Sequence, residues 1–339
     1  MFLHDKYSPK NIDDLYFHAN IFNRLVRMSK DNAIPHIILY GPPGVGKKTL
    51  SRMLLENIYD KSINDTQETN YIVNGSGNAT TNISIKQSAY HVVIDPNNNN
   101  FDRYLIQDIV KAYAKRIPMD VFHVSKNFRT VMINNVDNLS YYAQMSLRRT
   151  MEKYSNTCRF LMICNAISKL IEPLKSRCVC IRIPAPNNME ITGTLLHICY
   201  FEKYNLDLQT LLNISMIADG NVKIAIWLLD CAIRKISLVT TYDMTITKIV
   251  SLIWEKDLRN LPDIHVLLYN IFITNIPGTK IIGDITLKLC DKKINEQTKM
   301  KILDIAVKFD HYLTLGRREI THLNGFVNNV ILILKEESL

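Results

Sequence analysis

Short apolar runs and helical patterns alternate along the first half of the chain. Residues 37–40, 130–133 and 160–164 are mainly apolar, lean towards strand-forming types and have the length of a buried strand. Helical patterns occupy 102–115 and 141–154. Strands that alternate with helices are typical of an α/β layer. We therefore expect a parallel sheet covered by helices in this half.

Beyond Pro184 and Pro186, strand patterns nearly vanish and helical periodicity takes over. Between Pro262 and Pro277, apolar residues at helical spacing would form one helix face: Ile264, Leu267, Leu268, Ile271 and Phe272. A second face precedes Gly316: Ile302, Ile305, Ala306, Phe309 and Leu313. The second half of the chain is therefore expected to be all-α.

This change of pattern sets the predicted domain boundaries. We expect an α/β domain over 1–184, a small helical domain over 185–240 and a C-terminal helical domain over 241–339. The length of 339 residues fits two or three domains with real cores.

Composition excludes several classes of protein. Apolar residues make up 47% of the chain and charged residues 22%, as in an ordinary globular protein. No apolar run approaches the roughly 20 residues that span a bilayer. Asp5 and Lys6 interrupt the segment where a secretory signal needs an apolar core. The seven cysteines are odd in number and form no CxxC pair, so we expect reduced thiols and no metal site. Together, these features predict an intracellular protein without membrane contact.

The chain carries a formal net charge of +9, which attracts polyanions such as nucleic acids. The many Asn, Ile and Lys residues also fit an A/T-rich coding sequence, which would raise the Lys content without any link to binding. Charge alone therefore leaves the partner open.

The most specific motif follows the first predicted strand. Residues 41–49, GPPGVGKKT, fit the pattern GxxxxGK, and a helical pattern continues from them. In such a loop, backbone N–H groups and the helix N-terminus surround phosphate oxygens, and the lysine adds a positive charge. We therefore expect a nucleotide site formed by Gly41, Pro42, Pro43, Gly44, Val45, Gly46, Lys47, Lys48 and Thr49.

The loop departs from the motif at the magnesium ligand. Ser or Thr would bind Mg²⁺ at the position after Lys47, but this position holds Lys48. An ammonium group has only donors and cannot coordinate a cation. Thr49 comes one residue late. Lys48 is instead expected to take part of the cation's place beside the phosphates.

The acidic residues needed for catalysis are also missing. The predicted strand 130–133 ends in Asn134 and Asn135, where phosphoryl-transfer sites of this class place an acidic Mg²⁺ ligand and a residue that activates water. Asp137 lies beyond the strand end and is not expected to restore hydrolysis. A general base contributes roughly 10²–10⁴ in rate. We therefore expect ATP or ADP to be retained without turnover, and it stays open whether Mg²⁺ is bound.

Motifs spread over nearly the whole chain resemble those of one family. They are DKYSP at 5–9, PHIILYGPPGVGKKT at 35–49, SLRRTMEKYSNTCRF at 146–160, ICN at 163–165, IEPLKSRC at 171–178, RIPAP at 182–186 and HYLTLG at 311–316. The chain resembles the small subunits of replication factor C, the eukaryotic-type sliding-clamp loader of the AAA+ superfamily. The resemblance is strongest to the subunit-three type, whose own nucleotide site is degenerate.

The resemblance implies roles for single residues. Arg177 would be an arginine finger that reaches the neighbouring subunit's ATP, Asn165 the first sensor, and Lys223 would stand where the family has a second-sensor arginine. Tyr7 and Pro9 would line the adenine pocket, although the usual KYRP box has Ser8 in place of arginine here. Arg103, Arg148 and Arg149 match basic positions that face DNA, where they would contact phosphates without reading sequence.

The resemblance also implies the assembly. Residues 1–184 would be the AAA+ P-loop domain, 185–240 the lid and 241–339 the collar of a heteropentamer that loads a sliding clamp at primer-template DNA. Clamp contact would fall around 109–119. The resemblance implies a role in DNA replication and also in DNA repair. The protein would act in the nucleus of a cell or at a cytoplasmic replication site of a virus.

Two other functions stay open at this point. An autonomous AAA+ ATPase or remodeller would hydrolyse ATP as an isolated chain, and Asn134 and Asn135 count against it. In a DNA-binding scaffold that has lost nucleotide binding, Lys47→Ala would leave assembly and nucleotide content unchanged. The intact glycines of the loop and Lys47 itself count against this scaffold function.

Overall fold

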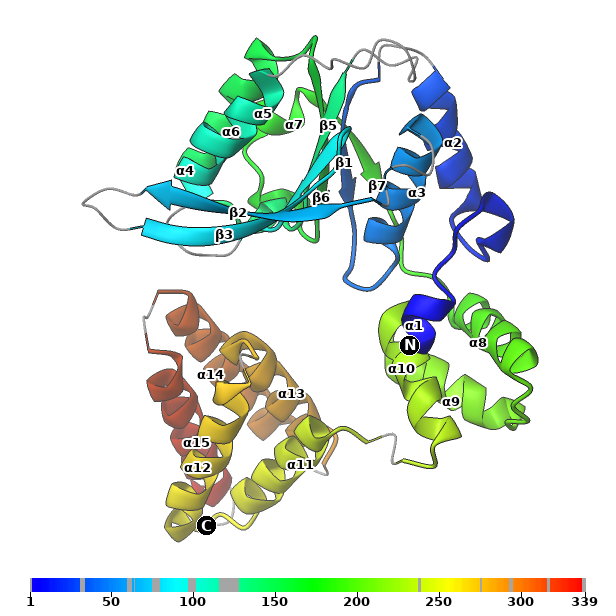
Figure 1. The fold of residues 1–339 in the computed structure, drawn as a ribbon. Coiled ribbons are helices and arrows are strands. Elements are labelled where there is room, and N and C mark those ends of the chain that lie inside the picture. Colours follow the sequence, from blue (N-terminus) through cyan, green and yellow to red (C-terminus); the bar gives the residue numbers. More distant parts are fainter. Residues whose placement is uncertain are drawn as a thin grey trace. The chain divides into compact units, whose positions relative to one another are not determined.

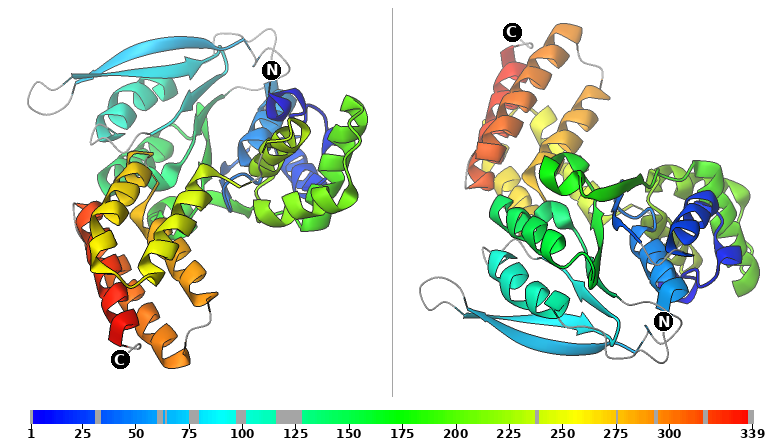
Figure 2. Two further views of the ribbon diagram at one scale, coloured as in Figure 1. Left: turned by 90° about the horizontal axis from the view of Figure 1, so that it is seen from below. Right: turned by 90° about the horizontal axis from the view of Figure 1, so that it is seen from above.

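The computed structural model describes residues 2–30, 34–59, 63, 65–74, 80–96, 102–115, 128–236, 239–274, 276–292, 295–315 and 318–336. The chain divides into two compact units, Met1–Ile236 and Ser237–Leu339. Figures 1 and 2 show that the sheet belongs to the first unit and that the second is built of helices. The predicted division near residue 185 stays a prediction.

Among the described residues, seven strands form one sheet in the order β2-β3-β4-β5-β6-β1-β7 (Figure 1). The pairs β4–β5, β5–β6, β6–β1 and β1–β7 are parallel. The strands are β1 (His36–Tyr40), β2 (Gln67–Asn74), β3 (Thr80–Gln87), β4 (His91–Ile94), β5 (Arg129–Ile133), β6 (Cys158–Cys164) and β7 (Cys178–Arg182). β1, β5 and β6 contain the three predicted strands, and the predicted α/β class is confirmed.

The antiparallel hairpin of β2 and β3 at one edge of the sheet is not among the predicted elements. Its apolar side chains are few: Ile85 is buried, and Tyr71 and Ile83 are partly buried against the same core. Polar residues fill most other positions of both strands. An edge hairpin with one solvent-exposed face therefore has too few apolar residues to be distinguished from a loop in the sequence.

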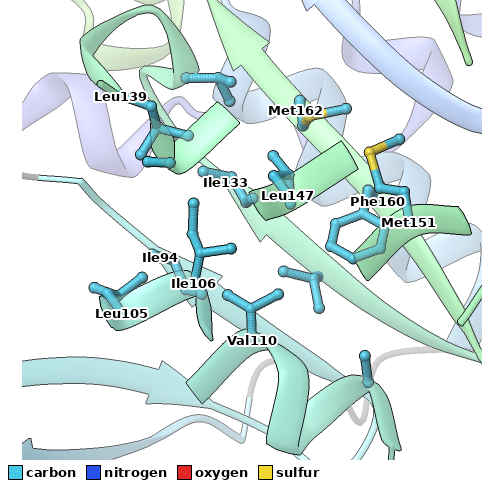
Figure 3. Close-up of a cluster of buried hydrophobic side chains, with 14 of the residues drawn as sticks. Ile94, Leu105, Ile106, Val110, Ile133, Leu139, Leu147, Met151, Phe160 and Met162 are labelled. Atoms are coloured by element: carbon cyan, nitrogen blue, oxygen red, sulfur yellow. The ribbon is translucent and has the colours of Figure 1, made fainter. Parts of the chain in front are cut away.

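Helices cover both faces of the sheet (Figure 1). α2 (Ala19–Lys30) and α3 (Lys47–Tyr59) pack on one face. The other face carries α4 (Asp102–Leu105), a π-helical turn (Ile106–Val110), α5 (Lys111–Lys115), α6 (Tyr141–Lys153) and α7 (Glu172–Lys175). Figure 3 shows the apolar side chains that fill this second layer. The predicted helices at 102–115 and 141–154 are confirmed, the first with its π-turn inside it.

The first unit also contains α1 (Leu3–Lys6) and three further helices, α8 (Asn188–Glu202), α9 (Leu208–Ala218) and α10 (Val222–Ile233). α8 begins at a capping box, in which Asn187 N donates to Glu190 Oε2 at 2.8 Å. Short 3₁₀ turns occupy Ile12–Asp14, Val136–Asn138 and Ile167–Lys169.

The second unit consists of α11 (Thr241–Trp254), a 3₁₀ turn (Leu258–Asn260), α12 (Leu261–Ile273), α13 (Gly278–Cys290), α14 (Glu296–Leu315) and α15 (Glu319–Glu336). Both predicted apolar faces lie on helices, α12 and α14, and their central residues are buried. Phe272 departs from this pattern, because its side chain is 36% exposed. The all-α class of this region is confirmed.

No helix among the residues that the structure describes is both long and apolar enough to cross a membrane. All seven cysteines are free thiols. Within the described ranges, no group of three or more His, Cys, Asp and Glu residues is arranged to hold a metal ion.

Gln144 ties α6 to the chain that follows β6. Its side chain is 3% exposed, its Nε2 donates to the carbonyls of Leu139 and Lys169 at 3.1 and 3.2 Å, and its Oε1 accepts from Ile171 N at 2.9 Å. Gln144→Leu should lower the free energy of unfolding by about 2 kcal/mol, because it leaves one buried and two part-buried backbone groups without their partner. Urea denaturation measures this. The control Gln209→Leu, at an exposed site on α9, should stay within about 0.5 kcal/mol, and an equal loss in both variants would contradict the assignment.

His91 makes the fold sensitive to acid. Burial lowers its pKa to about 4, and its Nδ1 lies 2.6 Å from Ser88 Oγ. A histidine whose pKa is lowered by folding contributes stability above its ordinary pKa near 6.5, and this is lost as the pH falls towards 4. Between pH 7.5 and 5.0, the wild type should therefore lose about 2 kcal/mol more than His91→Asn. Equal losses in the wild type and in His91→Asn would contradict this.

Candidate functional site

The carboxyl ends of the parallel strands bring four predicted or polar positions to one edge of the sheet. Gly41 follows β1, Asp95 follows β4, Asn134 follows β5 and Asn165 follows β6. Parallel strands end at the same edge, so residues far apart in sequence become neighbours there. In open α/β sheets this edge is where ligands bind.

The loop at 41–46 has a backbone that its glycines make possible. A Cβ at Gly41 would lie 2.1 Å from the carbonyl oxygen of Ile183, and Gly44 and Gly46 have φ of +76° and +89°. Side chains are strongly disfavoured in this conformation. Val45 is fully buried in the core and anchors the loop, whereas Pro42 and Pro43 are exposed. The predicted phosphate loop therefore has a defined shape ahead of α3.

Lys47 links the loop to β6. Its Nζ donates to the carbonyls of Gly41 and Pro42 at 2.5 and 2.6 Å and to Asn165 Oδ1 at 2.9 Å. The residue is 6% exposed. Burial lowers the pKa of Lys47, and the nearby Cys164 and Asp137 oppose this shift. The structure thus brings two predicted site residues, Lys47 and Asn165, into direct contact.

Lys48 points to a different partner. Its Nζ lies 3.7 Å from Asp95 Oδ1, and both side chains are more than half exposed. Thr49 is half-buried in the first turn of α3. The expectation that Lys48 lies beside the phosphates stays a prediction, and Asp95 is a site neighbour that the sequence motifs do not signal.

The end of β5 carries two amide side chains at the positions where phosphoryl-transfer sites of this class have acidic residues. Asn134 is 3% exposed, its N–H donates to the carbonyl of Ile94 at 2.9 Å, and its Oδ1 is buried with no hydrogen-bond partner among the described residues. Asn135 has φ of +48°, which turns the chain sharply at the strand end.

This turn brings Asp137 back to the sheet edge. Its Oδ2 lies 3.4 Å from Asn165 N, and its Oδ1 is buried without a described partner. Asp137 is therefore closer to Lys47 and Asn165 than its place beyond the strand indicates. A carboxylate does lie near the loop, but it comes from the 3₁₀ turn after β5 and not from the strand end.

α10 contributes a residue that the sequence motifs do not single out. The amide of Asn221 caps α10 by accepting from Ile224 N at 3.2 Å, and a Cβ at Gly44 would lie 1.8 Å from its Oδ1. Asn221 therefore lies against the phosphate loop. Lys223, two residues on, is exposed, with Nζ 5.8 Å from the centre of the Trp227 ring. The structure thus gives no contact between the predicted second sensor and the loop.

The N-terminal segment packs on the helices that follow the sheet. Tyr7 Oη donates to Glu202 Oε1 at 2.8 Å, and Lys6 Nζ lies 2.5 Å from the same oxygen. Burial, followed by the hydrogen bond to Glu202, raises the pKa of Tyr7. Tyr7 is thus attached to α8, Pro9 is half-buried, and the predicted adenine contact of both residues stays a prediction.

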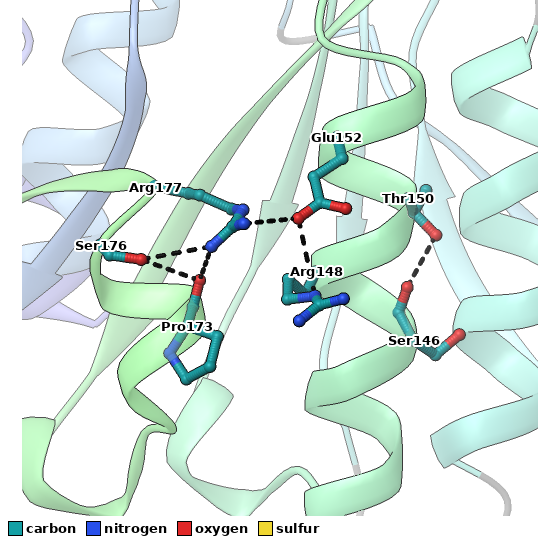
Figure 4. A network of polar contacts seen from close by, with 7 residues as sticks. All are labelled: Ser146, Arg148, Thr150, Glu152, Pro173, Ser176 and Arg177. Carbon is teal, nitrogen blue, oxygen red and sulfur yellow. Dashed lines mark hydrogen bonds and ion pairs between the residues drawn. The ribbon is translucent and has the colours of Figure 1, made fainter.

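Arg177 lies between α7 and β7 and faces α6 (Figure 4). Its Nη1 donates to the carbonyl of Pro173 at 2.8 Å and to Ser176 Oγ at 3.2 Å, and its Nη2 lies 2.7 Å from Glu152 Oε1. Its side chain remains 38% exposed. The predicted finger is therefore held in place by neighbours but accessible, and Glu152 is a partner that sequence analysis missed. Its only signal is its i+4 spacing from Arg148.

The predicted DNA contacts differ in exposure. Arg103 on α4 and Arg149 on α6 are exposed, and α4 packs against α6. Arg148 is half-buried, and its Nε lies 3.6 Å from Glu152 Oε1. In the predicted clamp-contact stretch, Ile109, Val110 and Tyr113 are buried in the core, and 116–119 lie outside the described residues. Lys111, Ala112 and Lys115 are exposed in the same stretch, and the predicted clamp contact stays a prediction.

Comparison with known proteins identifies the family. The family described as "Replication factor C subunit 3, C-terminal domain" matches residues 242–338, and that described as "DNA polymerase III, delta subunit" matches 17–187. A replication factor C small subunit of Acanthamoeba polyphaga mimivirus is 37% identical over 98% of this chain and 90% of its own length. The chain belongs to the replication factor C small-subunit family. Replication factor C subunit 5 of Saccharomyces cerevisiae is 32% identical over 97% of this chain and 98% of its own, and subunit 3 of Arabidopsis thaliana is 32% identical over 98% and 97%.

Membership in the replication factor C family confirms the resemblance drawn from the motifs, together with the AAA+ P-loop fold that it implies. Among solved structures, the Thermotoga maritima RuvB Holliday junction branch migration motor is similar with a TM-score of 0.47 and 14% identity, over 70% of each chain. The roles predicted for single site residues stay predictions.

Proposed function

We propose that this chain is a small subunit of a DNA sliding-clamp loader that acts in DNA replication. It binds ATP or ADP without hydrolysing it and supplies Arg177 to the nucleotide of a neighbouring subunit. The observation that carries the proposal is the similarity to replication factor C small subunits over 98% of the chain, because it includes both the phosphate loop and the C-terminal helices.

Nucleotide retention is supported by the loop geometry. Lys47 already touches Asn165 and two loop carbonyls, so its ammonium lies at the edge where phosphates would bind. On binding, it would exchange these neutral acceptors for phosphate oxygens, which form stronger hydrogen bonds with a cation. Glycines at 41, 44 and 46 leave the backbone free to approach the ligand.

A silent site is supported by Asn134 and Asn135 at the end of β5. Amides neither accept a proton from water nor bind Mg²⁺ as carboxylates do. Losing a general base lowers a rate by roughly 10²–10⁴. Lys48 adds a positive charge near the position where the family motif places a magnesium ligand.

Assembly into a heteropentamer is supported by apolar surface on the second unit. Large apolar side chains are exposed by more than half on successive helices: Val266 and Ile273 on α12, Leu287 on α13, Met300 and Val307 on α14. Apolar surface repeated in this way is typical of subunit contacts. Arg103 and Arg149 would meet primer-template DNA through its phosphates, and the sliding clamp is the third partner. The site of action would be the nucleus of a cell or the cytoplasmic replication site of a virus.

The test is reconstitution. The remaining loader subunits, the cognate clamp and primed circular DNA are assembled with and without this chain, and clamps retained on the DNA are counted. The proposal predicts that loading requires this chain and that Asn134→Ala, which alters a site without turnover, supports loading. Full loading without the chain would contradict the proposed function.

One observation favours a second function. The carboxylate of Asp137 lies beside Asn165 near the loop, and its buried Oδ1 has no hydrogen-bond partner among the described residues, so this oxygen could accept a proton from a water molecule bound there in an autonomous ATPase. Hydrolysis by the isolated chain that is lost in Asp137→Asn would favour this alternative.

A further inference from the structure

One carboxylate oxygen serves two arginines on the side of α6. Glu152 Oε1 lies 2.7 Å from Arg177 Nη2 and 3.6 Å from Arg148 Nε (Figure 4). The first distance is that of a close ion pair, and the second is too long for a hydrogen bond. Glu152 therefore holds Arg177 and leaves Arg148 only weakly paired.

Arg148 is left with an unpaired donor. Its Nε is buried and has no hydrogen-bond partner within the part of the chain that the structure describes. A buried N–H without an acceptor is unfavourable. A small side-chain movement of Glu152 would bring the same oxygen within hydrogen-bond distance of Arg148. The carboxylate thus has a second partner already in place.

The hold on Arg177 is one that a phosphate can displace. The side chains of Arg177 and Glu152 are 38% and 41% exposed, and water weakens ion pairs at such exposure. The bonds of Nη1 to Pro173 and Ser176 come from the residue's own turn, so they can persist while Nη2 changes partner.

We propose that Glu152 is a positioning residue that restrains Arg177 until a nucleoside triphosphate of the neighbouring subunit binds it, whereupon the carboxylate transfers to Arg148. This rests on the proposed function of Arg177. Arg148 keeps the carboxylate paired in the second arrangement, so releasing the finger leaves no isolated charge. The two arrangements differ only in which arginine takes Oε1.

The proposal predicts opposite effects for two variants. Glu152→Gln removes the charge that restrains Arg177 and should free its guanidinium. Arg148→Ala removes the competing arginine and should leave Glu152 to Arg177 alone. If the network only supported the fold, both variants would act in the same direction.

The first experiment measures the accessibility of Arg177 in the isolated full chain. Phenylglyoxal modifies arginines, and mass spectrometry gives the rate at Arg177 relative to the exposed Arg149. Glu152→Gln should raise this rate up to about fivefold, as for loss of a partly exposed ion pair, and Arg148→Ala should lower it. The control Glu172→Gln removes the same charge at an 81% exposed site paired with Lys175, and should change nothing. An unchanged or lower rate in Glu152→Gln would overturn the proposal.

The second experiment uses the reconstituted loader and the neighbouring subunit's ATP site. Glu152→Gln should lower the ATP concentration needed for half-maximal turnover, and Arg148→Ala should raise it. Shifts in the same direction would overturn the transfer. Arg177→Ala distinguishes failure of the proposed finger role from failure of the proposed restraint. Unchanged turnover in Arg177→Ala would refute the finger role of Arg177. The phenylglyoxal rates would still decide whether Glu152 restrains Arg177. Thermal melting shows that each variant is folded.

Discussion

Arg177→Ala is expected to lower ATP hydrolysis at the neighbouring subunit's site by roughly a thousandfold, although we propose that the altered chain itself does not hydrolyse ATP. An arginine supplied in trans stabilises the charge that develops on the transferred phosphoryl group, and this contributes 10³–10⁵ in rate in other systems. The guanidinium of Arg177 is accessible, and the turn that holds it also positions it at one end of β7. The measurement is single-turnover hydrolysis in a complex where the other active sites are silenced.

The matched control is Lys175→Ala. Lys175 lies two residues away on α7 and pairs with Glu172 at 2.8 Å, so its loss removes a positive charge but no guanidinium. Turnover in this variant should stay within about threefold of the wild type, because a partly exposed ion pair contributes little. Equal losses in both variants would indicate a general charge effect, and an unaltered rate in Arg177→Ala would refute the finger.

Lys47→Ala is expected to weaken nucleotide binding by roughly a hundredfold. A hydrogen bond to a charged group contributes about 1.5–3 kcal/mol, which corresponds to a factor of ten to a hundred or more. Removal of Lys47 also leaves Asn165 Oδ1 without its donor at 2.9 Å. Isothermal titration with ADP and with ATP measures the change directly, with and without Mg²⁺.

Lys48→Ala tests which of the two lysines, Lys47 or Lys48, contributes more to nucleotide affinity. The Lys48 ammonium is 61% exposed and lies 3.7 Å from Asp95, so its removal disturbs a solvated pair. Affinity should fall less than tenfold, as for an exposed charge. A larger loss in Lys48→Ala than in Lys47→Ala would show that Lys48, and not Lys47, provides most of the positive charge at the phosphates.

Much of the first unit was predictable from sequence because its signals are local. The apolar strand at 37–40, the glycines of the loop and the helix after it all lie within about two dozen residues, and each follows from periodicity or from the geometry that glycine permits. The edge hairpin of β2 and β3 was missed because one of its faces is polar, so its apolar residues are too sparse to stand out.

The site was only partly predictable because its remaining contacts are long-range. Asn221, at the start of α10, lies against Gly44 of the phosphate loop, and Glu152 on α6 pairs with Arg177, which follows α7. Nothing in the spacing of such pairs reveals that they meet. The closeness of Asp137 to Asn165 could not be predicted either, because the left-handed turn at Asn135 is not visible in a pattern of apolar residues.

The central claim is that this chain holds nucleotide without hydrolysing it. The most direct test purifies the full chain alone, denatures one sample to identify released nucleotide, and measures ATP hydrolysis with Mg²⁺ in a native sample. Bound ADP or ATP with negligible turnover is the predicted result. Robust turnover that Asp137→Asn abolishes would contradict the account and establish an autonomous ATPase.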